Sequence, residues 1–356
     1  MKKRIVTLLL AGAAVGGLVF AGSAAQAAEP KAKVITWIGQ SALPSGMPVS
    51  VGLQELSDRI RISSGGRLDW KVKPAGSVVP ATEEWKAINK GVLDFAAGGS
   101  SYMVPDIPFG SIISQRVGAK ISPLAHMMWF ETGGRDLVNK WFKELGHKFI
   151  DIGGLHGLPE GWIHLNKPLK GPQDLKGLKM RASGDGGIVL SRMGVGTVFM
   201  PLGEVFENMK RGVIDAYEAS NPSFDYDLGL HEAGKYYYLS STRAPWENYE
   251  ILVSRAKWES LPNDLKKIVE DAIGATQISY HARLVAKNAK AVQGFKDKGV
   301  IVEILPSSID DAFIAEATKF LDEQAAKHPS MKEVLTSQRN FEASWKQLYG
   351  LPVPGK

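Results

Sequence analysis

Segments of strand length alternate with segments of helical periodicity along this chain, and the alternation occurs twice. Before about residue 150 the pattern predicts strands at 34–39, 67–74 and 93–99, and helices at 49–63 and 83–90, the second capped by Thr82. Strands and helices at this spacing are typical of α/β units around a parallel sheet. Further helices are predicted at 122–130 and 133–145. The chain is therefore predicted to be an α/β protein.

The second occurrence of the alternation has more and shorter strands. The predicted strands are 148–155, 161–165, 178–182, 197–201, 215–220, 235–241, 249–254 and 300–305, with helices at 186–193, 203–211 and 262–297. No flexible Gly/Ser linker separates the halves, so the chain is expected to cross between domains more than once. We predict one α/β domain mainly from 28–150 and a second mainly from 151–356, with C-terminal helices and a ligand cleft between the domains.

The first 27 residues are predicted to be a secretory signal peptide and not part of the fold. Lys2, Lys3 and Arg4 precede an apolar run, and small residues around Ala27 form a cleavage site. A membrane anchor is the alternative, but the run is rich in Gly and Ala and ends in a cleavage signature. We therefore expect a periplasmic protein that is cleaved near Ala27.

Charge and residue usage exclude several functional classes. Removing the signal peptide takes away three positive charges and no acids, so the formal net charge falls from +6 to +3. That charge is too small and too dispersed to indicate a nucleic-acid partner. The chain has no Cys, no G-x-S-x-G nucleophile elbow and no H-x-x-x-H metal pair. Nucleophilic catalysis and a histidine or cysteine metal site therefore find no support.

Arg181 stands at the end of a predicted strand, directly before the glycine-rich segment "SGDGG" that opens a helix. A guanidinium is permanently charged, and its planar fork matches a carboxylate. The helix N-terminus beside it adds to the field that favours an anion. The residues alone leave two interpretations open: an ion pair with an internal acid, or a partner for an acid that comes from outside.

Two further groups of residues are candidates for ligand contacts. Aromatic residues fall near predicted strand ends, where they could enclose an organic acid or simply pack in the core: Trp37, Tyr102, Phe109, Trp162, Tyr217 and Trp246. Oxygen-bearing residues follow the strand at 215–220: Glu218, Asn221, Asp225 and Asp227. Their spacing is not that of an EF-hand loop. The alternative to a metal site is a solvated, acid-rich loop that caps the next helix.

Several motifs together carry a resemblance to a known family. The order "DLKGLKMR", "MPLGEVFENMKRGVIDAYE", with "ISSGGRL", "INKGVLDFA" and "PFG" in the first half, resembles the DctP-like solute receptors of tripartite ATP-independent periplasmic (TRAP) transporters. The closest subgroup binds keto acids and related monocarboxylates. The resemblance implies a periplasmic binding protein fold with a long helix spanning both domains, and it matches Arg181 to the family's carboxylate-binding arginine.

The resemblance also implies a function and its partners. The receptor would close around an organic acid and deliver it to the TRAP membrane permease subunits, and it would not be an enzyme. An exported enzyme acting on an organic acid, with His156 or His164 and Glu218 as acid/base groups, is the alternative. Relatives that pair through C-terminal helices make a homodimer possible.

The sequence departs from the subgroup where some keto-acid receptors hold their ligand through a cation. Glu218 matches an acidic metal ligand, so a sodium or calcium ion bridging the ligand is one expectation. Ala219 replaces an expected Trp, and Arg243 and Ala244 stand about where a second acid is expected. A site with no cofactor, in which Arg243 neutralises the ligand or pairs with Glu218, is the other expectation. The candidate ligand-binding residues are Arg181, Trp162, Glu218, Asn221, Tyr102, Trp37, Arg243 and Trp246.

Overall fold

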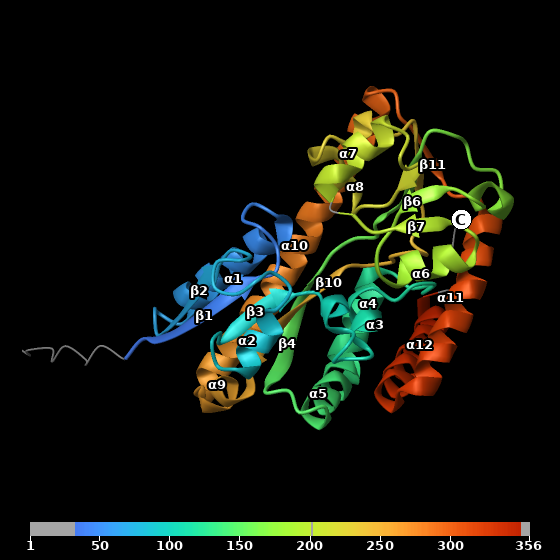
Figure 1. Ribbon diagram of the computed structural model, residues 1–356. Helices are drawn as coiled ribbons and strands as arrows, with labels where there is room; N and C mark the ends of the chain where they lie inside the picture. The colour runs from blue at the N-terminus through green and yellow to red at the C-terminus, as the bar shows by residue number, and fades with distance from the viewer. Residues whose placement is uncertain (1–32, 201, 350–356) are drawn as a thin grey trace, which may run out of the picture. The chain divides into compact units, whose positions relative to one another are not determined.

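Two mixed β-sheets form the framework of the protein (Figure 1). The computed structural model describes residues 33–200 and 202–349, so the predicted signal peptide and its cleavage site near Ala27 lie outside the described residues. Strands and helices alternate along most of the described chain. The predicted α/β class is therefore confirmed.

The first sheet combines strands from distant parts of the chain. Its spatial order is β2 (Leu68–Lys73), β1 (Ile35–Ser41), β3 (Phe95–Gly98), β10 (Asn248–Ser254) and β4 (Phe149–His156). β1 pairs in parallel with β2 and β3, but β10 lies antiparallel to both β3 and β4. The predicted parallel arrangement is confirmed for β1, β2 and β3, whereas β10, from the second half of the chain, enters this sheet in the opposite direction.

The helices beside this sheet follow the predicted pattern closely. Their bounds are α1 (Pro48–Ser63), α2 (Glu84–Asn89), α3 (Gly110–Ser114), α4 (Pro123–Trp129), α5 (Arg135–Glu144) and α9 (Arg255–Ser260). In α1, Pro48 stands in the first turn, and Leu53, Leu56 and Ile60 bury one helical face. The predicted cap of α2 is wrong: Glu83 is the N-cap residue, and Thr82 adopts a left-handed conformation with φ of 71°.

The second sheet carries the shorter strands of the chain. Its order is β11 (Ile301–Ile304), β9 (Tyr236–Leu239), β5 (Gly161–Leu165), β8 (Ala216–Tyr217), β6 (Lys179–Arg181) and β7 (Gly196–Val198). β5 is antiparallel to β8 and β9, whereas β6 is parallel to β7 and β8. Helices α6 (Gly184–Arg192), α7 (Leu202–Lys210) and α8 (Pro222–Asp227) connect these strands. The predicted strand at 215–220 is reduced to β8, because the chain turns away at Glu218.

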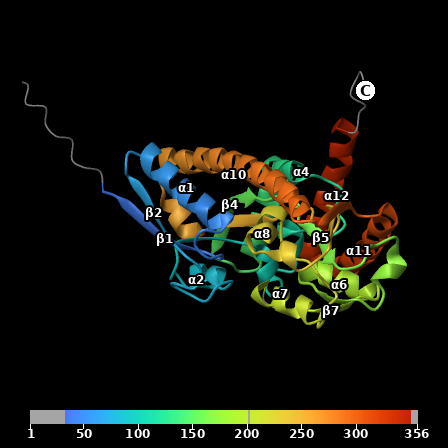
Figure 2. The same cartoon turned by 90° about the horizontal axis from the view of Figure 1, so that it is seen from above.

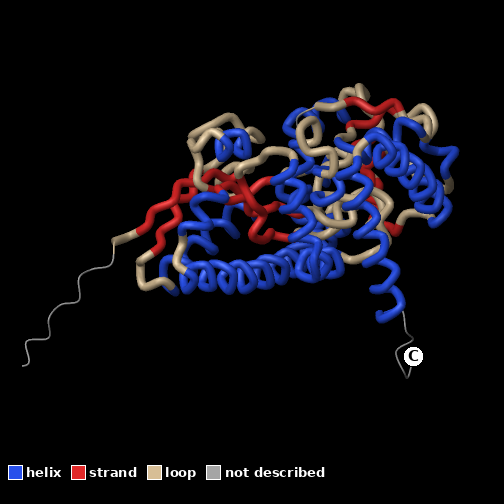
Figure 3. Tube along the Cα trace, turned by 90° about the horizontal axis from the view of Figure 1, so that it is seen from below, coloured by secondary structure: helices blue, strands red, loops and turns tan. Residues whose placement is uncertain are grey.

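The long helix α10 (Asn263–Asp297) runs past both sheets, as predicted (Figures 2 and 3). Near its start, Leu265, Val269 and Ile273 pack in the core of the first sheet. Near its end, Phe295 packs against Tyr237 of the second sheet. At the first sheet the helix contacts α1 and β4, and at the second sheet it contacts α8 and β11. One element therefore shares the hydrophobic cores of both sheets.

Two C-terminal helices complete the fold. α11 (Ser307–Lys327) packs on α6, and α12 (Pro329–Tyr349) packs on α11, α4 and α5. Shorter helical turns occur at Ser100–Met103, Phe130–Gly134, Pro172–Leu175 and Leu230–Glu232. Among the helices of the described chain, none combines the length and the apolar character that a membrane crossing requires.

Candidate functional site

One edge of the second sheet brings the ends of four strands together. Arg181 is the last residue of β6, and Glu218 directly follows the parallel strand β8. Glu160 directly precedes β5, which runs the other way, and Arg243 follows β9. The backbone N–H of Glu218 donates to the carbonyl oxygen of Arg181 at 3.1 Å. The mixed strand directions therefore gather two guanidinium groups and two carboxyl groups at one edge.

Two of the three guanidinium nitrogens of Arg181, Nε and Nη1, have acceptors within the protein. Nη1 lies 2.9 Å from Oε1 of Glu218 and 2.6 Å from the carbonyl oxygen of the same residue. Nε donates to the carbonyl oxygen of Met200 at 3.2 Å. Within residues 33–200 and 202–349, no acceptor pairs with Nη2. Arg181 also lines a cavity, so this free nitrogen is available to a ligand.

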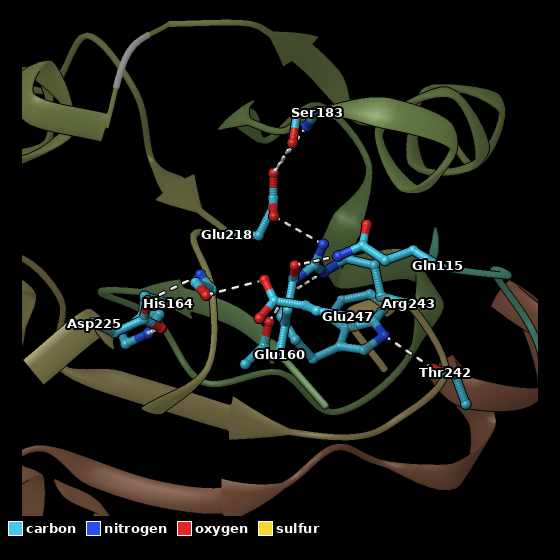
Figure 4. A network of polar contacts seen from close by, with 12 residues as sticks. Gln115, Glu160, His164, Ser183, Glu218, Asp225, Thr242, Arg243 and Glu247 are labelled. Carbon is cyan, nitrogen blue, oxygen red and sulfur yellow. Dashed lines mark hydrogen bonds and ion pairs between the residues drawn. The ribbon is translucent and has the colours of Figure 1, made fainter. Parts of the chain in front are cut away.

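Glu218 is buried and contacts both arginines, and Figure 4 shows it with Ser183 and Arg243. Its Oε1 also accepts hydrogen bonds from the backbone N–H and the hydroxyl of Ser183, at 2.8 and 3.0 Å. Its Oε2 lies 2.8 Å from Nη1 of Arg243. Burial raises the pKa of Glu218, and the positive charges of Arg243 and Arg181 oppose that rise. Glu218 is therefore a fully used internal acceptor that fixes both guanidinium groups.

Arg243 is buried, and each of its nitrogens has an acceptor. Nη2 donates to Oε2 of Glu160 at 2.5 Å and to the carbonyl oxygen of Gly161 at 2.8 Å. Nε donates to the carbonyl oxygen of Trp162 at 3.3 Å, and Nη1 faces Glu218. Burial works to lower the pKa of Arg243, but Glu218 and Glu160 outweigh it and raise the pKa above its ordinary value. Arg243 is therefore an internal cation and not an open ligand contact.

Glu247 adds a third carboxyl group beside the cavity. Its Oε1 accepts a hydrogen bond from the hydroxyl of Ser220 at 3.1 Å. Burial raises the pKa of Glu247 well above its ordinary value, and the neighbouring Glu160 raises it further. The protonated form is therefore favoured, and it offers an O–H donor. With Glu247 neutral, the two arginines balance Glu160 and Glu218.

A cavity of about 420 Å³ opens in front of these groups. Tyr249 of β10 and Tyr102, in the helical turn after β3, line it, together with Ser183 and Phe199 from the connections after β6 and β7. The Phe199 ring lies 5.8 Å from Cζ of Arg181. The volume is that of a small-molecule site, and its lining mixes apolar side chains with a few convergent polar groups.

The structure brings only part of the predicted residue set to this cavity. Arg181 and Tyr102 line it, and Glu218 and Arg243 lie directly behind Arg181. Three tryptophans pack in hydrophobic clusters instead: Trp37 against Trp70, Trp162 against Phe313, and Trp246 against His126. Core packing, the other interpretation of the aromatic residues, describes these three.

The residues after β8 cap and brace the chain. Asn221 caps α8, since its side chain accepts from the N–H of Phe224. The solvated loop expected around Asp225 is wrong, because Asp225 is fully buried and binds His164 at 3.2 Å and Tyr237 at 3.1 Å.

The histidines considered for catalysis are placed elsewhere. His156 is buried against Gln277 of α10, at 3.1 Å, and His164 pairs with Asp225. Burial lowers the pKa of His156 to about 3 and also lowers that of His164. Neither histidine contributes to the lining of the cavity beside Arg181.

Sequence reasoning missed two acids and one amide of the site. Glu160 lies in "HGLPEGW", directly before a predicted strand, and Glu247 lies in "STRAPWENYE", directly before another. Gln115 donates to Glu160 across the cavity wall. Both acids lie just before a strand. In an antiparallel pair the start of one strand lies beside the end of its neighbour, and this was the signal available for both acids.

Comparison with known proteins gives a family match over most of the chain. The model of the DctP family, described as bacterial extracellular solute-binding protein, family 7, matches residues 38–328. A monocarboxylate 2-oxoacid-binding periplasmic protein of Nostoc sp. is 27% identical over 90% of this chain and 86% of the relative.

Solved structures share the fold. A TRAP periplasmic solute binding protein from Colwellia psychrerythraea, with bound calcium and pyruvate, has a TM-score of 0.79 and 24% identity over 89% of this chain and 98% of that one. A TRAP transporter solute binding protein from Bordetella bronchiseptica, with copurified calcium and picolinate, has a TM-score of 0.78 and 23% identity over 89% of this chain and 95% of that one. Both likenesses fit two sheets around a ligand cavity.

Proposed function

Because this chain belongs to the bacterial extracellular solute-binding proteins of family 7, we propose that it is the receptor of a TRAP transporter and captures an organic acid in the cavity beside Arg181. The family consists of receptors and not of enzymes, so the alternative of an exported enzyme loses its basis. A receptor needs a cavity that binds its solute reversibly, and a charged group that selects it.

The observation that carries the proposal is the open part of Arg181. Glu218 and Met200 fix Nη1 and Nε, so the side chain is oriented before the ligand arrives. Nη2 keeps its donors for a carboxylate oxygen. A preoriented guanidinium loses little conformational entropy on binding, and its hydrogen bond to a carboxylate is charge-assisted. An acid therefore binds here in preference to a neutral solute of the same shape.

The remaining cavity wall favours a small acid with a second oxygen. Glu247 in its protonated form donates a hydrogen bond, which a keto or carboxylate oxygen accepts. Tyr102 and Phe199 offer faces for a short apolar body. A 2-oxo monocarboxylate combines these features, and the relative from Nostoc is named for this class. We propose this class as the solute.

The proposed partners follow from the family. The receptor acts in the periplasm and passes its acid to the membrane permease of the transporter. A homodimer is also proposed, because the Bordetella bronchiseptica relative is described as a dimer.

A thermal-shift series tests the carboxylate assignment. The mature chain is heated with pyruvate and longer 2-oxo acids, with dicarboxylates, and with pyruvamide as the matched neutral control. A ligand present at about 100 times its dissociation constant raises the melting temperature by several degrees. We expect a shift with a 2-oxo acid and none with pyruvamide. An equal shift with the amide, or a shift only with uncharged solutes, contradicts the proposal.

A further inference from the structure

The carboxylates that face the cavity edge are already joined by a positive group of the chain itself. Nη1 of Arg243 lies 2.8 Å from Glu218, and Nη2 lies 2.5 Å from Glu160. We infer that Arg243 is a built-in cation that takes the place of a metal ion, so that this receptor binds its acid without sodium or calcium. The inference deepens the proposed function and rests on it for the location of the site.

The carboxylate oxygens of Glu218 and Glu160 already have contacts within the protein. Oε1 of Glu218 accepts from Arg181 and twice from Ser183, and its Oε2 faces Arg243. For Glu160, Oε1 accepts from Gln115 and Oε2 accepts from Arg243. Calcium requires six to eight oxygen ligands. Glu218, the predicted metal ligand, would have to break its contact with Arg243 to bind one.

The backbone around Arg243 also accommodates a guanidinium group. The carbonyl oxygens of Gly161 and Trp162 accept from Arg243, in addition to the two carboxylates. Gly186 leaves room for the aliphatic stem, since a Cβ at this position would lie 3.0 Å from Cγ of Arg243. The arginine is buried, and a guanidinium keeps its charge even there.

The other acidic and histidine side chains of the described residues also do not form a metal site. Across the described ranges 33–200 and 202–349, no group of three His, Asp or Glu residues is arranged to hold a metal ion. Two solved relatives of the same fold are described with bound calcium together with an organic acid. In this chain the positive charge that joins Glu160 and Glu218 is covalently attached.

Calcium binding by the mature protein tests the inference without any need for the solute. The chain is dialysed against EDTA in a sodium-free choline buffer, and its melting temperature is measured with and without 5 mM calcium or 100 mM sodium. For the wild type we expect a change of less than about 1 °C with either ion, because no site is open to them. A clear rise with calcium or sodium overturns the inference.

The Arg243→Met variant supplies the converse result. It removes the arginine that pairs with Glu160 and leaves Glu218 with Arg181 alone, so the melting temperature should fall by roughly 5 °C or more. Calcium should restore much of that loss by binding between the two carboxylates. The matched control is Arg192→Met, since Arg192 also pairs with two glutamates, Glu316 and Glu323, but at the surface. Calcium should not stabilise this control.

The outcomes separate the two proposals. If Arg243→Met does not fold, Arg243→Lys keeps the charge on a flexible stem, and it should gain no calcium response. A clear rise in the melting temperature of Arg243→Lys with calcium would overturn the inference. None of these measurements uses an organic acid, so their results can be interpreted even if the carboxylate proposal fails.

Discussion

Arg181 and Glu218 contact each other twice: Nη1 of the arginine lies 2.9 Å from the carboxylate and 2.6 Å from the backbone carbonyl oxygen of the same residue. The two contacts fix the plane of the guanidinium from one side. An internal ion pair and a ligand contact are therefore not alternatives at Arg181. Glu218 orients the guanidinium, and among the described residues Nη2 has no acceptor, as the proposed contact with a solute requires.

Arg181→Lys should abolish most of the solute affinity while the protein stays folded. Lysine keeps the charge but cannot contact Glu218 and an external carboxylate with separate nitrogens of one rigid plane. We expect the dissociation constant for the best acid to rise by at least about tenfold, which corresponds to about 1.4 kcal/mol. Isothermal titration calorimetry measures the change, and Arg192→Lys at the surface is the control. Unchanged affinity in Arg181→Lys would remove the arginine from the site.

Glu247→Gln should remove a pH dependence of binding. The raised pKa keeps Glu247 neutral at low pH, and ionisation at higher pH adds a third negative charge beside Glu160 and Glu218. Affinity for an acid should therefore fall as pH rises in the wild type and stay flat in the variant. The nearby Tyr249 and Tyr280 have raised pKa values and do not titrate in this range.

Calorimetric titrations from pH 5 to 9 measure this difference. The control is Glu259→Gln, which changes an exposed acid. The assignment fails if Glu247→Gln keeps the pH slope of the wild type.

Glu250→Gln should flatten the pH dependence of stability. Burial raises the pKa of Glu250 from 4.5 to about 8, although Ser100 and Ser114 donate hydrogen bonds to it. The folded state therefore retains a proton that the unfolded chain releases. The resulting stabilisation is complete below about pH 4.5 and is lost as pH rises through about 8. Its full size is several kcal/mol, about 5 at most.

Urea denaturation at a series of pH values checks this prediction. Between pH 5 and 8 the wild type should lose more stability than Glu250→Gln. Asp151, whose pKa burial raises to about 6, adds to the slope of both proteins. Parallel curves for the wild type and the variant would show that Glu250 is ionised in the folded state, as it is in the unfolded chain, and would contradict the raised pKa.

Thr242→Val should destabilise the protein by about 2 to 4 kcal/mol. The hydroxyl of Thr242 accepts from Nε1 of the buried Trp162 at 3.0 Å and donates to Asp310 at 2.6 Å. Valine has the same shape but leaves the indole N–H without a partner. Chemical denaturation measures the loss. Thr318→Val, on an exposed helix face, should change stability by less than about 0.5 kcal/mol, and an equal effect in both variants would rule out the buried bond as the cause.

Much of the fold was predictable from periodicity. The predicted helix at 262–297 and the observed α10 differ by one residue at the start, because its pattern is long and uninterrupted. The direction of β10 was not predictable in the same way. The seven-residue segment NYEILVS reads the same for a parallel and an antiparallel strand, and only pairing with β3 and β4 decides between them.

At Arg181 the residues alone left two interpretations open, an internal ion pair and an anion contact. The structure shows the ion pair with Glu218 and places Arg181 beside the cavity, where the anion contact stays a prediction. Trp37, Trp162 and Trp246 carried no comparable signal, because a tryptophan near a strand end packs equally well in a core. Glu247 lies before a strand, but its raised pKa was not predictable, since it arises from burial and from Glu160 and not from its neighbours in sequence.

The position of β10 between β3 and β4 sets the order of events when this protein folds. β3 and β4 are both synthesised well before residues 248–254, yet they cannot join into one sheet until β10 lies between them. A chain cut short before Asn248 should keep two open strand edges and fail to fold. Late closure of this kind slows folding, because distant segments must first meet. If the chain is exported, as its proposed role in the periplasm requires, such a delay would keep it unfolded for longer after synthesis.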